Sequence, residues 1–171
     1  MSESEKHSDL FLPYLHGNGV DLGCGGRPVV PWAIGIDLPV EKYMAYHGPL
    51  KTAGTFQWGG DARDLPFKDA TLDFVFSSHL LEDFEDWTPV LREWARVLKP
   101  RGFLVVLIPD RKRFQAALAA GHPPNDAHRH EGRVGELTEH ITRIGGFDVV
   151  TDRLTDQNPQ DYSILFVARK A

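Results

Sequence analysis

Two short apolar runs in the middle of the chain constrain its fold more than any other feature. The runs LDFVFSS and GFLVVLIP are apolar on both faces, as strands inside a parallel sheet that is covered by helices must be. They give the predicted strands Leu72–Ser77 and Phe103–Ile108. Five further segments have the composition of strands: Gly19–Leu22, Ala33–Leu38, Phe56–Gly59, Phe147–Leu154 and Tyr162–Ala168.

Helical patterns separate several strands in the second half of the chain. Thr88 is the predicted N-cap of a helix that ends before Pro100. A second helix begins with Asp110 as its N-cap and ends at Gly121, and a third runs from about Val134 to a pair of glycines. The alternation predicts an α/β fold with a doubly wound sheet, in which ligands bind beyond the carboxyl ends of the strands.

Length and composition limit the kind of protein. The 171 residues suit one domain, 1–171, and we expect the polar residues 1–9 to form a flexible tail. A net charge of -5 argues against a nucleic-acid partner, because such binding depends on neutralising phosphates. No apolar run approaches the ~20 residues of a membrane span, and the polar start is unlike a signal peptide, so we expect a cytoplasmic protein without a membrane partner.

A glycine-rich loop, VDLGCGGRP, follows the first predicted strand directly. Glycines allow the backbone to turn sharply and to approach a ligand closely. The fingerprint of nicotinamide cofactors needs a third glycine and an acidic residue about 20 positions further on. Here Pro28 stands in the third position, and Asp37 follows Gly25 by only twelve residues. The spacing therefore disfavours a nicotinamide-dependent oxidoreductase.

An aspartate stands at or near the carboxyl end of each of the first three predicted strands: Asp21, Asp37 and Asp61. The carboxylate of Asp37 can accept hydrogen bonds from both hydroxyls of a ribose. The carboxylate of Asp61, beside an apolar wall, can accept a hydrogen bond from an exocyclic amine. Three such residues in succession favour a nucleoside-containing ligand in the crevice.

The ordered set DLGCGG, GIDLP, GDARDLPFKDATLDFVFSSHLLEDFEDW and LREWARVLKPRGFLVVLIPD resembles the class I S-adenosylmethionine-dependent methyltransferases, over about residues 18–110. It is most similar to the methyltransferase type 11 group. The resemblance implies a Rossmann-like, mostly parallel seven-stranded sheet whose last strand is antiparallel and lies beside the sixth. It also implies S-adenosylmethionine as cofactor and a small or medium-sized acceptor.

Position by position, the resemblance implies which residues bind the cofactor. The methionine part would lie against Asp21, Gly23, Cys24 and Gly25, the ribose against Asp37, the adenine against Leu38, Asp61 and Ala62, and the methionine end with the acceptor near Ser77, Ser78 and His79. The sequence departs from the family where Arg27 replaces a glycine. Because Pro28 and Pro31 lie in the short segment before the second strand, residues 26–31 are predicted to form an irregular loop instead of a crossover helix.

The chain offers few candidates for chemistry beyond cofactor binding. His79 is the candidate general base, because imidazole titrates near neutral pH. The alternative is that it packs or positions substrate, since a methyl group on a sulfonium is already activated. His122, His128 and His130 lie near Glu131, but no partner set with zinc spacing accompanies them, so no metal site is predicted. This stretch is expected to form a loop beside the acceptor.

Charge is distributed unevenly along the chain. Residues 61–86 carry a net charge of -6, with eight acidic and two basic side chains, and residues 92–113 carry +5, with seven basic and two acidic. In the first turn of the helix after Asp110, basic side chains oppose the helix dipole. We therefore predict that at least one of Arg111, Lys112 and Arg113 binds an acceptor that bears a carboxylate or a phosphate, with Arg111 and Arg113 as the candidates. The alternative is a solvated basic turn that pairs with residues 61–86.

The sequence leaves one functional alternative open. Because no residue is a compelling catalytic base, the chain is either a methyltransferase or a non-catalytic S-adenosylmethionine-binding module that regulates a partner. The sequence contains no signal for an oligomeric state.

Overall fold

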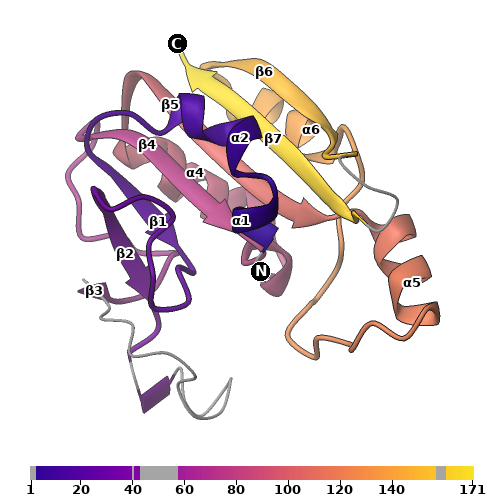
Figure 1. Ribbon diagram of the computed structural model, residues 1–171. Helices are drawn as coiled ribbons and strands as arrows, with labels where there is room; N and C mark the ends of the chain where they lie inside the picture. The colour runs from indigo at the N-terminus through magenta and orange to yellow at the C-terminus, as the bar shows by residue number, and fades with distance from the viewer. Residues whose placement is uncertain (1–2, 40, 43–57, 157–160) are drawn as a thin grey trace.

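The structure, a computed structural model, describes residues 3–39, 41–42, 58–156 and 161–171. Within these residues, seven strands form one sheet in the order β3-β2-β1-β4-β5-β7-β6 (Figure 1). The strands are β1 (Gly19–Leu22), β2 (Ala33–Asp37), β3 (Trp58–Gly59), β4 (Leu72–Ser78), β5 (Leu98–Pro109), β6 (Phe147–Leu154) and β7 (Ser163–Lys170).

The pairing of the strands confirms the predicted fold class. β1 pairs in parallel with β2 and with β4, and the pairs β2–β3 and β4–β5 are also parallel. β7 lies between β5 and β6 and runs antiparallel to both, with Val105 opposite Val167. The start of the predicted third strand, residues 56–57, lies outside the described residues.

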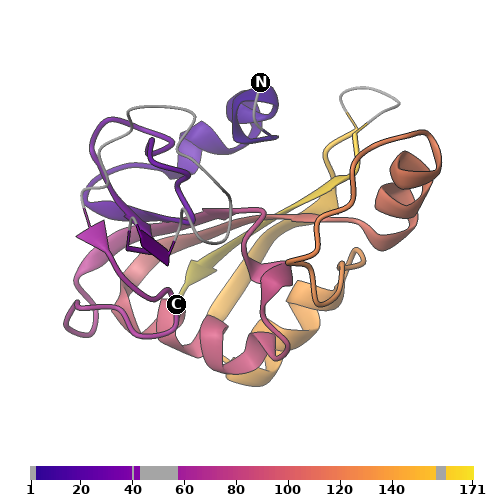
Figure 2. The same ribbon diagram turned by 90° about the horizontal axis from the view of Figure 1, so that it is seen from below.

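One face of the sheet is covered by two amphipathic helices, α4 (Trp87–Val97) and α6 (Glu136–Ile144) (Figure 2). They cover a core that includes the fully buried side chains Leu91, Trp94, Val106 and Phe166. The N-cap of α4 is Asp86, whose carboxylate accepts a hydrogen bond from Thr88 N at 2.9 Å. The prediction that Thr88 is the cap is wrong, because a carboxylate two residues earlier already serves the free N–H group.

The N-terminal segment covers the other face (Figures 1 and 2). It consists of α1 (Glu3–Lys6), α2 (Ser8–Phe11) and the 3₁₀ turn η1 (Leu12–Tyr14). Phe11 is fully buried and its ring lies 4.8 Å from that of Phe76 on β4. His7 is also fully buried. The expectation of a flexible tail therefore does not hold over residues 3–9.

Loops replace two of the crossover helices that usually flank such a sheet. Residues 23–32, between β1 and β2, form turns and bends without a helix, which confirms the loop predicted from Pro28 and Pro31. Residues 60–71, between β3 and β4, contain no helix either. In the described part of the chain, these two connections therefore add no helix to the cover of the sheet.

Two further elements lie at the carboxyl edge of the sheet: the 3₁₀ turn η2 (Leu81–Asp83) and the helix α5 (Arg111–Ala119) (Figure 1). Asp110 caps α5, as predicted, by accepting a hydrogen bond from Arg113 N at 3.0 Å. The chain leaves the helix through Gly121, which has a φ of 96°. Among the described residues, no helix has the length and apolar character needed to cross a membrane.

Candidate cofactor and acceptor site

Two adjoining cavities lie at the carboxyl ends of the parallel strands. The larger has a volume of about 1340 Å³ and extends from the loop after β1 to α5 and the start of β7. The smaller has a volume of about 260 Å³ and lies beyond β2 and β3. Gly23 lines both cavities. The site therefore has the position that ligands take in doubly wound sheets.

The glycine loop after β1 turns around the point where the cavities meet. Gly23, Gly25 and Gly26 have φ values of 73°, 60° and 86°, a region that other residues rarely adopt. A Cβ atom added at Gly25 would meet nothing within 4 Å, so the loop backbone faces open space there. A ligand in the larger cavity can approach this backbone directly.

Asp37, at the end of β2, holds the glycine loop in place. One carboxylate oxygen accepts a hydrogen bond from Gly25 N at 2.9 Å, and the other accepts one from Leu38 N at 2.7 Å. Because each carboxylate oxygen can accept about two hydrogen bonds, capacity remains for a ligand in the smaller cavity. The predicted ribose and adenine residues meet here: Asp37, Leu38, Asp61 and Ala62 all line this cavity.

Asp61 already has a strong partner. The guanidinium of Arg63 contacts both carboxylate oxygens, at 2.6 Å for the shortest pair. The hydrogen bond from Arg63 lowers the pKa of the Asp61 carboxyl. A ligand amine at this position would share the carboxylate with Arg63, which also lies 5.9 Å from the centre of the Phe84 ring.

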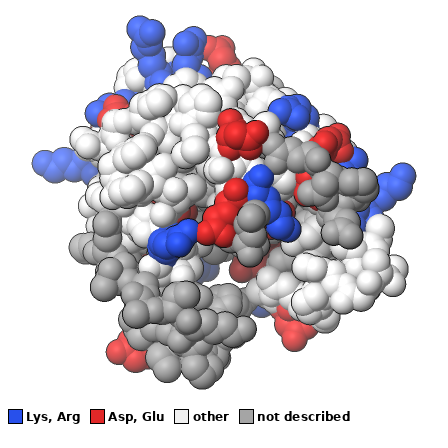
Figure 3. Space-filling view, viewed as in Figure 1, with Lys and Arg blue, Asp and Glu red and all other residues white. Residues whose placement is uncertain are grey.

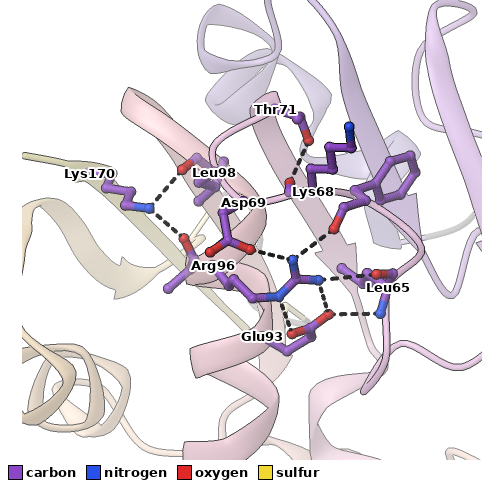
Figure 4. A network of polar contacts seen from close by, with 10 residues as sticks. Leu65, Lys68, Asp69, Thr71, Glu93, Arg96, Leu98 and Lys170 are labelled. Carbon is purple, nitrogen blue, oxygen red and sulfur yellow. Dashed lines mark hydrogen bonds and ion pairs between the residues drawn. The ribbon is translucent and has the colours of Figure 1, made fainter.

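Hydrogen bonds from α4 hold the loop that carries Asp61 and Ala62. The buried indole of Trp94 donates a hydrogen bond to the Ala62 carbonyl at 2.8 Å. Arg96 donates to the Leu65 carbonyl and forms ion pairs with Asp69 and Glu93 (Figure 4). Arg96 belongs to the basic segment 92–113 and Asp69 to the acidic segment 61–86, so part of that charge asymmetry is satisfied within the chain.

A buried carboxyl, Asp21, lies next to the glycine loop, and a half-buried thiol, Cys24, lies within it. Asp21 is nearly fully buried and accepts a hydrogen bond from Val29 N at 2.6 Å. Burial raises the pKa of its carboxyl to about 8, against the opposing effect of that hydrogen bond. Burial also raises the pKa of the Cys24 thiol to about 12, which suits a filler of space and not a nucleophile.

The residues after β4 separate into two groups. Ser78 and His79 line the larger cavity, whereas Ser77 is fully buried and donates a hydrogen bond to the Leu22 carbonyl at 3.3 Å. The imidazole Nε2 of His79 lies 3.0 Å from Ser163 Oγ, and Nδ1 lies 3.3 Å from a carboxylate oxygen of Glu82. Both ring nitrogens thus have protein partners, which favours the positioning role of His79 over that of a general base.

The two arginines predicted to bind an anionic acceptor are turned toward the protein. Arg111 donates to the Glu131 carbonyl at 2.9 Å, and Arg113 donates to the Asp161 carbonyl at 3.1 Å and pairs with Asp156. Neither is among the residues that line the two cavities. This geometry runs against the predicted role, because the guanidinium groups satisfy backbone carbonyls at the base of α5.

Sequence reasoning placed His122 and His128 in a loop beside the acceptor but missed Phe114 and Tyr162, which lie with them at the far end of the larger cavity. Phe114, His122, His128 and Tyr162 all line it. Phe114, His122 and His128 lie on α5 and the loop after it, and the inserted antiparallel strand β7 brings Tyr162 beside them. In the described part of the chain, no group of three or more His, Cys, Asp or Glu residues is arranged to hold a metal ion.

Comparison with known proteins agrees with this site. Residues 20–106 match the family described as "Methyltransferase domain". The chain belongs to this methyltransferase family. The matched residues include the glycine loop, Asp37, Asp61 and β4, and thus most of the candidate cofactor site.

Two named methyltransferases are similar in sequence to part of this chain. A probable S-adenosylmethionine-dependent methyltransferase of Mycobacterium tuberculosis is 35% identical over 134 residues, which cover 78% of this chain and 46% of that protein. The demethylmenaquinone methyltransferase of Halalkalibacterium halodurans is 48% identical over 103 residues, covering 53% and 42%. This methyltransferase chain spans between about a third and a half of the length of the first curated relatives that it matches.

Solved structures support the fold. An S-adenosylmethionine-dependent methyltransferase from Mesorhizobium loti superimposes with a TM-score of 0.70 at 20% identity, covering 99% of both chains. A methyltransferase from Thermotoga maritima gives a TM-score of 0.69 at 21% identity, covering 98% of this chain and 88% of that one. At these identities the similarity establishes the Rossmann-like fold of the chain.

Proposed function

We propose that this methyltransferase chain binds S-adenosylmethionine across the two cavities and transfers its methyl group to a small or medium-sized acceptor. The observation that carries the proposal is the junction of the cavities, where the Asp37 carboxylate holds the open backbone of Gly25 at 2.9 Å. The nucleoside part of the cofactor in the smaller cavity and its methionine part in the larger one would both reach this junction.

The residues present fit such a cofactor. Asp37 would accept the ribose hydroxyls, the side chains of Leu38, Ala62 and Phe84 would lie against the adenine, and the Gly23–Gly26 backbone would follow the methionine part. When bound, the cofactor supplies a methyl group on a sulfonium, which an acceptor's lone pair can attack while the electron pair of the broken C–S bond stays on sulfur. The protein contributes alignment of the acceptor and exclusion of water.

Calorimetry with S-adenosylmethionine and S-adenosylhomocysteine tests the binding step. Asp37→Ala should weaken the affinity roughly ten- to hundredfold, because it removes charge-assisted hydrogen bonds worth about 1.5–3 kcal/mol. Asp148→Ala is the matched control, because Asp148 is an exposed carboxylate on β6 that pairs with Arg169 far from the cavities. Equal affinities of the wild type and Asp37→Ala would refute the assignment.

The alternative function is a binding module without turnover. We infer catalysis because the larger cavity continues beyond the glycine loop and leaves room for a second molecule beside the methionine end. Incubation with cofactor labelled in the methyl group, followed by fractionation of a small-molecule extract, distinguishes the two. Label in a new compound, together with S-adenosylhomocysteine, supports the enzyme; tight binding without either product supports the module.

A further inference from the structure

Four rings form a cluster at the end of the larger cavity away from the glycine loop: Phe114, His122, His128 and Tyr162, hereafter the ring cluster. The centre of the Phe114 ring lies 5.0 Å from that of His128 and 5.4 Å from that of Tyr162. The centres of the His122 and Tyr162 rings lie 5.3 Å apart. Each ring therefore contacts at least one other.

The rings of this cluster meet at an angle to one another. Their planes are inclined by 39° between Phe114 and His128, by 61° between Phe114 and Tyr162, and by 57° between His122 and Tyr162. Rings in tilted and edge contact leave faces that are not covered by each other. Because all four also line the cavity, they can offer both faces and edges to a planar ligand.

Carboxylates lie close to the ring cluster and to the cavity that it lines. His128 lies between two carboxylates, with Nε2 3.6 Å from Glu82 and Nδ1 3.5 Å from Glu131. Glu3 lines the same cavity, where hydrogen bonds from Lys6 and Ser163 outweigh the effect of burial and lower its pKa. An acceptor that bears a carboxylate or a phosphate would be repelled here.

Cations near the cavity are already paired. Of the described residues that line it, Arg27 is the one arginine or lysine, and its guanidinium pairs with Glu5. Figure 3 shows acidic and basic side chains next to one another in the middle of the face that it presents. Arg111 and Arg113 are turned toward the backbone carbonyls described above. An anionic acceptor would therefore find no ready partner among these groups.

From these observations we infer that the ring cluster is the acceptor subsite, and that it takes a planar aromatic ring that is neutral or positively charged. Aromatic faces bind other rings by offset or edge contact, and they attract cations. The inference rests on the proposed function, since the glycine loop in the same cavity would hold the methionine end of the cofactor. The acceptor ring would then lie beside the transferable methyl group.

Binding of four small probes tests the subsite in the protein saturated with S-adenosylhomocysteine. The probes are benzylamine, benzyl alcohol, cyclohexylmethylamine and phenylacetate, titrated by ligand-observed NMR. Benzylamine and benzyl alcohol should bind. Cyclohexylmethylamine, which has the same charge as benzylamine but no aromatic ring, should bind at least about threefold more weakly. Phenylacetate should be the weakest of the four.

Variants locate the binding. Tyr162→Leu and His122→Leu should each weaken benzylamine binding at least about fivefold, and His122 is exposed, so its replacement leaves the core intact. Phe103→Leu is the matched control, because Phe103 packs against Tyr14 outside the cavity. It should leave benzylamine binding unchanged.

Three outcomes would overturn the inference: phenylacetate binding as tightly as benzylamine, equal affinities of the cyclohexyl and benzyl amines, or unchanged binding in both ring variants. Calorimetry of S-adenosylhomocysteine in the same proteins separates the two levels of argument. If that ligand binds normally but ring selectivity is absent, the ring cluster fails and the proposed function stands. If it does not bind to the wild type, the proposed function fails first.

Discussion

The two faces of the sheet are built in different ways. On one face, α4 and α6 present amphipathic stripes to a single large core, and the fully buried Trp94 and Leu91 lie in its centre. On the other face, two four-residue helices and a 3₁₀ turn depend on a smaller core around Phe11 and Leu15. The larger cavity opens beside this second covering.

Because of this difference, the face covered by α4 and α6 contributes most to the stability of the fold. The face covered by the N-terminal segment gives a ligand access to the larger cavity. Regular helices of nine or eleven residues bury one continuous stripe and resist local opening. Short helices make few internal hydrogen bonds and are free to open without the rest of the fold. Glu3, Ser4 and Ser8 line the larger cavity from this less regular segment. A ligand in this cavity would therefore lie beneath a segment that opens more readily than α4 and α6 do.

The largest expected effect comes from the helix face. Trp94→Ala should lower the free energy of unfolding by about 3–5 kcal/mol, because it removes a fully buried indole and leaves a cavity. It also removes the hydrogen bond to the Ala62 carbonyl. Urea denaturation measures the loss. A decrease below about 1 kcal/mol would contradict the central place of Trp94 in this core.

Phe11→Ala is the matching change on the other face. It should cost less, about 2–3 kcal/mol, because the N-terminal segment can detach locally once its anchor is removed. Amide hydrogen exchange should accelerate mainly within residues 3–15 and leave β4 and β5 protected. If exchange rises throughout the sheet as much as in Trp94→Ala, the two faces do not differ in the way described.

The sequence was informative where a local pattern determines the structure. The apolar stripes predicted α4 and α6, and Pro28 with Pro31 predicted the loop in place of a crossover helix. Asp110 was correctly predicted as the cap of α5 because the competing groups are few. At α4 two capping residues stand close together, and the geometry that favours Asp86 over Thr88 depends on the direction in which the chain enters the helix.

Long-range contacts could not be predicted in this way. The segment at residues 1–9 is polar, yet His7 is buried because the fold brings it within 3.9 Å of Asp161. The ring cluster requires the antiparallel insertion of β7, which brings Tyr162 next to Phe114. No sequence pattern predicts that these single aromatic residues lie close together. The proximity of the strand-end aspartates was easier to predict, because the carboxyl ends of parallel strands lie at the same edge of the sheet.

The pH dependence of stability tests the raised pKa of Asp21, which lines the larger cavity. Burial raises the pKa of Asp21 to about 8, so the folded state keeps a proton that the unfolded state has lost. The stabilising contribution of this proton is full below the ordinary pKa of 3.8 and is lost as the pH rises toward 8. Asp21→Asn should therefore gain about 2 kcal/mol relative to the wild type between pH 5.5 and 7.5.

Chemical denaturation of both proteins at the two pH values measures this relative gain. The carboxyl of Asp83 also has a raised pKa, about 7, which burial causes, but it is present in both proteins and cancels in the difference. A difference that stays constant from pH 5.5 to 7.5 would show that Asp21 does not titrate with a raised pKa.

The smallest expected effect concerns the polar anchor of the N-terminal segment. Glu3 accepts a hydrogen bond from Ser163 Oγ at 2.8 Å and another from Lys6; burial opposes its ionisation, but these bonds prevail and lower its pKa. A lowered pKa stabilises the fold above the ordinary value of 4.5 and ceases to do so as the pH falls through the lowered one. Glu3→Gln should therefore cost about 0.5–1 kcal/mol at pH 7, and this cost should shrink toward zero as the pH falls through the lowered pKa of Glu3.

The matched change on the helix face is Glu139→Gln, because Glu139 also has a pKa lowered by an arginine, Arg133, but is exposed to solvent. Its effect at pH 7 should be smaller and should vanish in high salt, since water and ions screen an exposed pair. Equal losses in the two variants, or a loss in Glu3→Gln that persists at low pH, would show that the N-terminal segment is not anchored through the charge of Glu3.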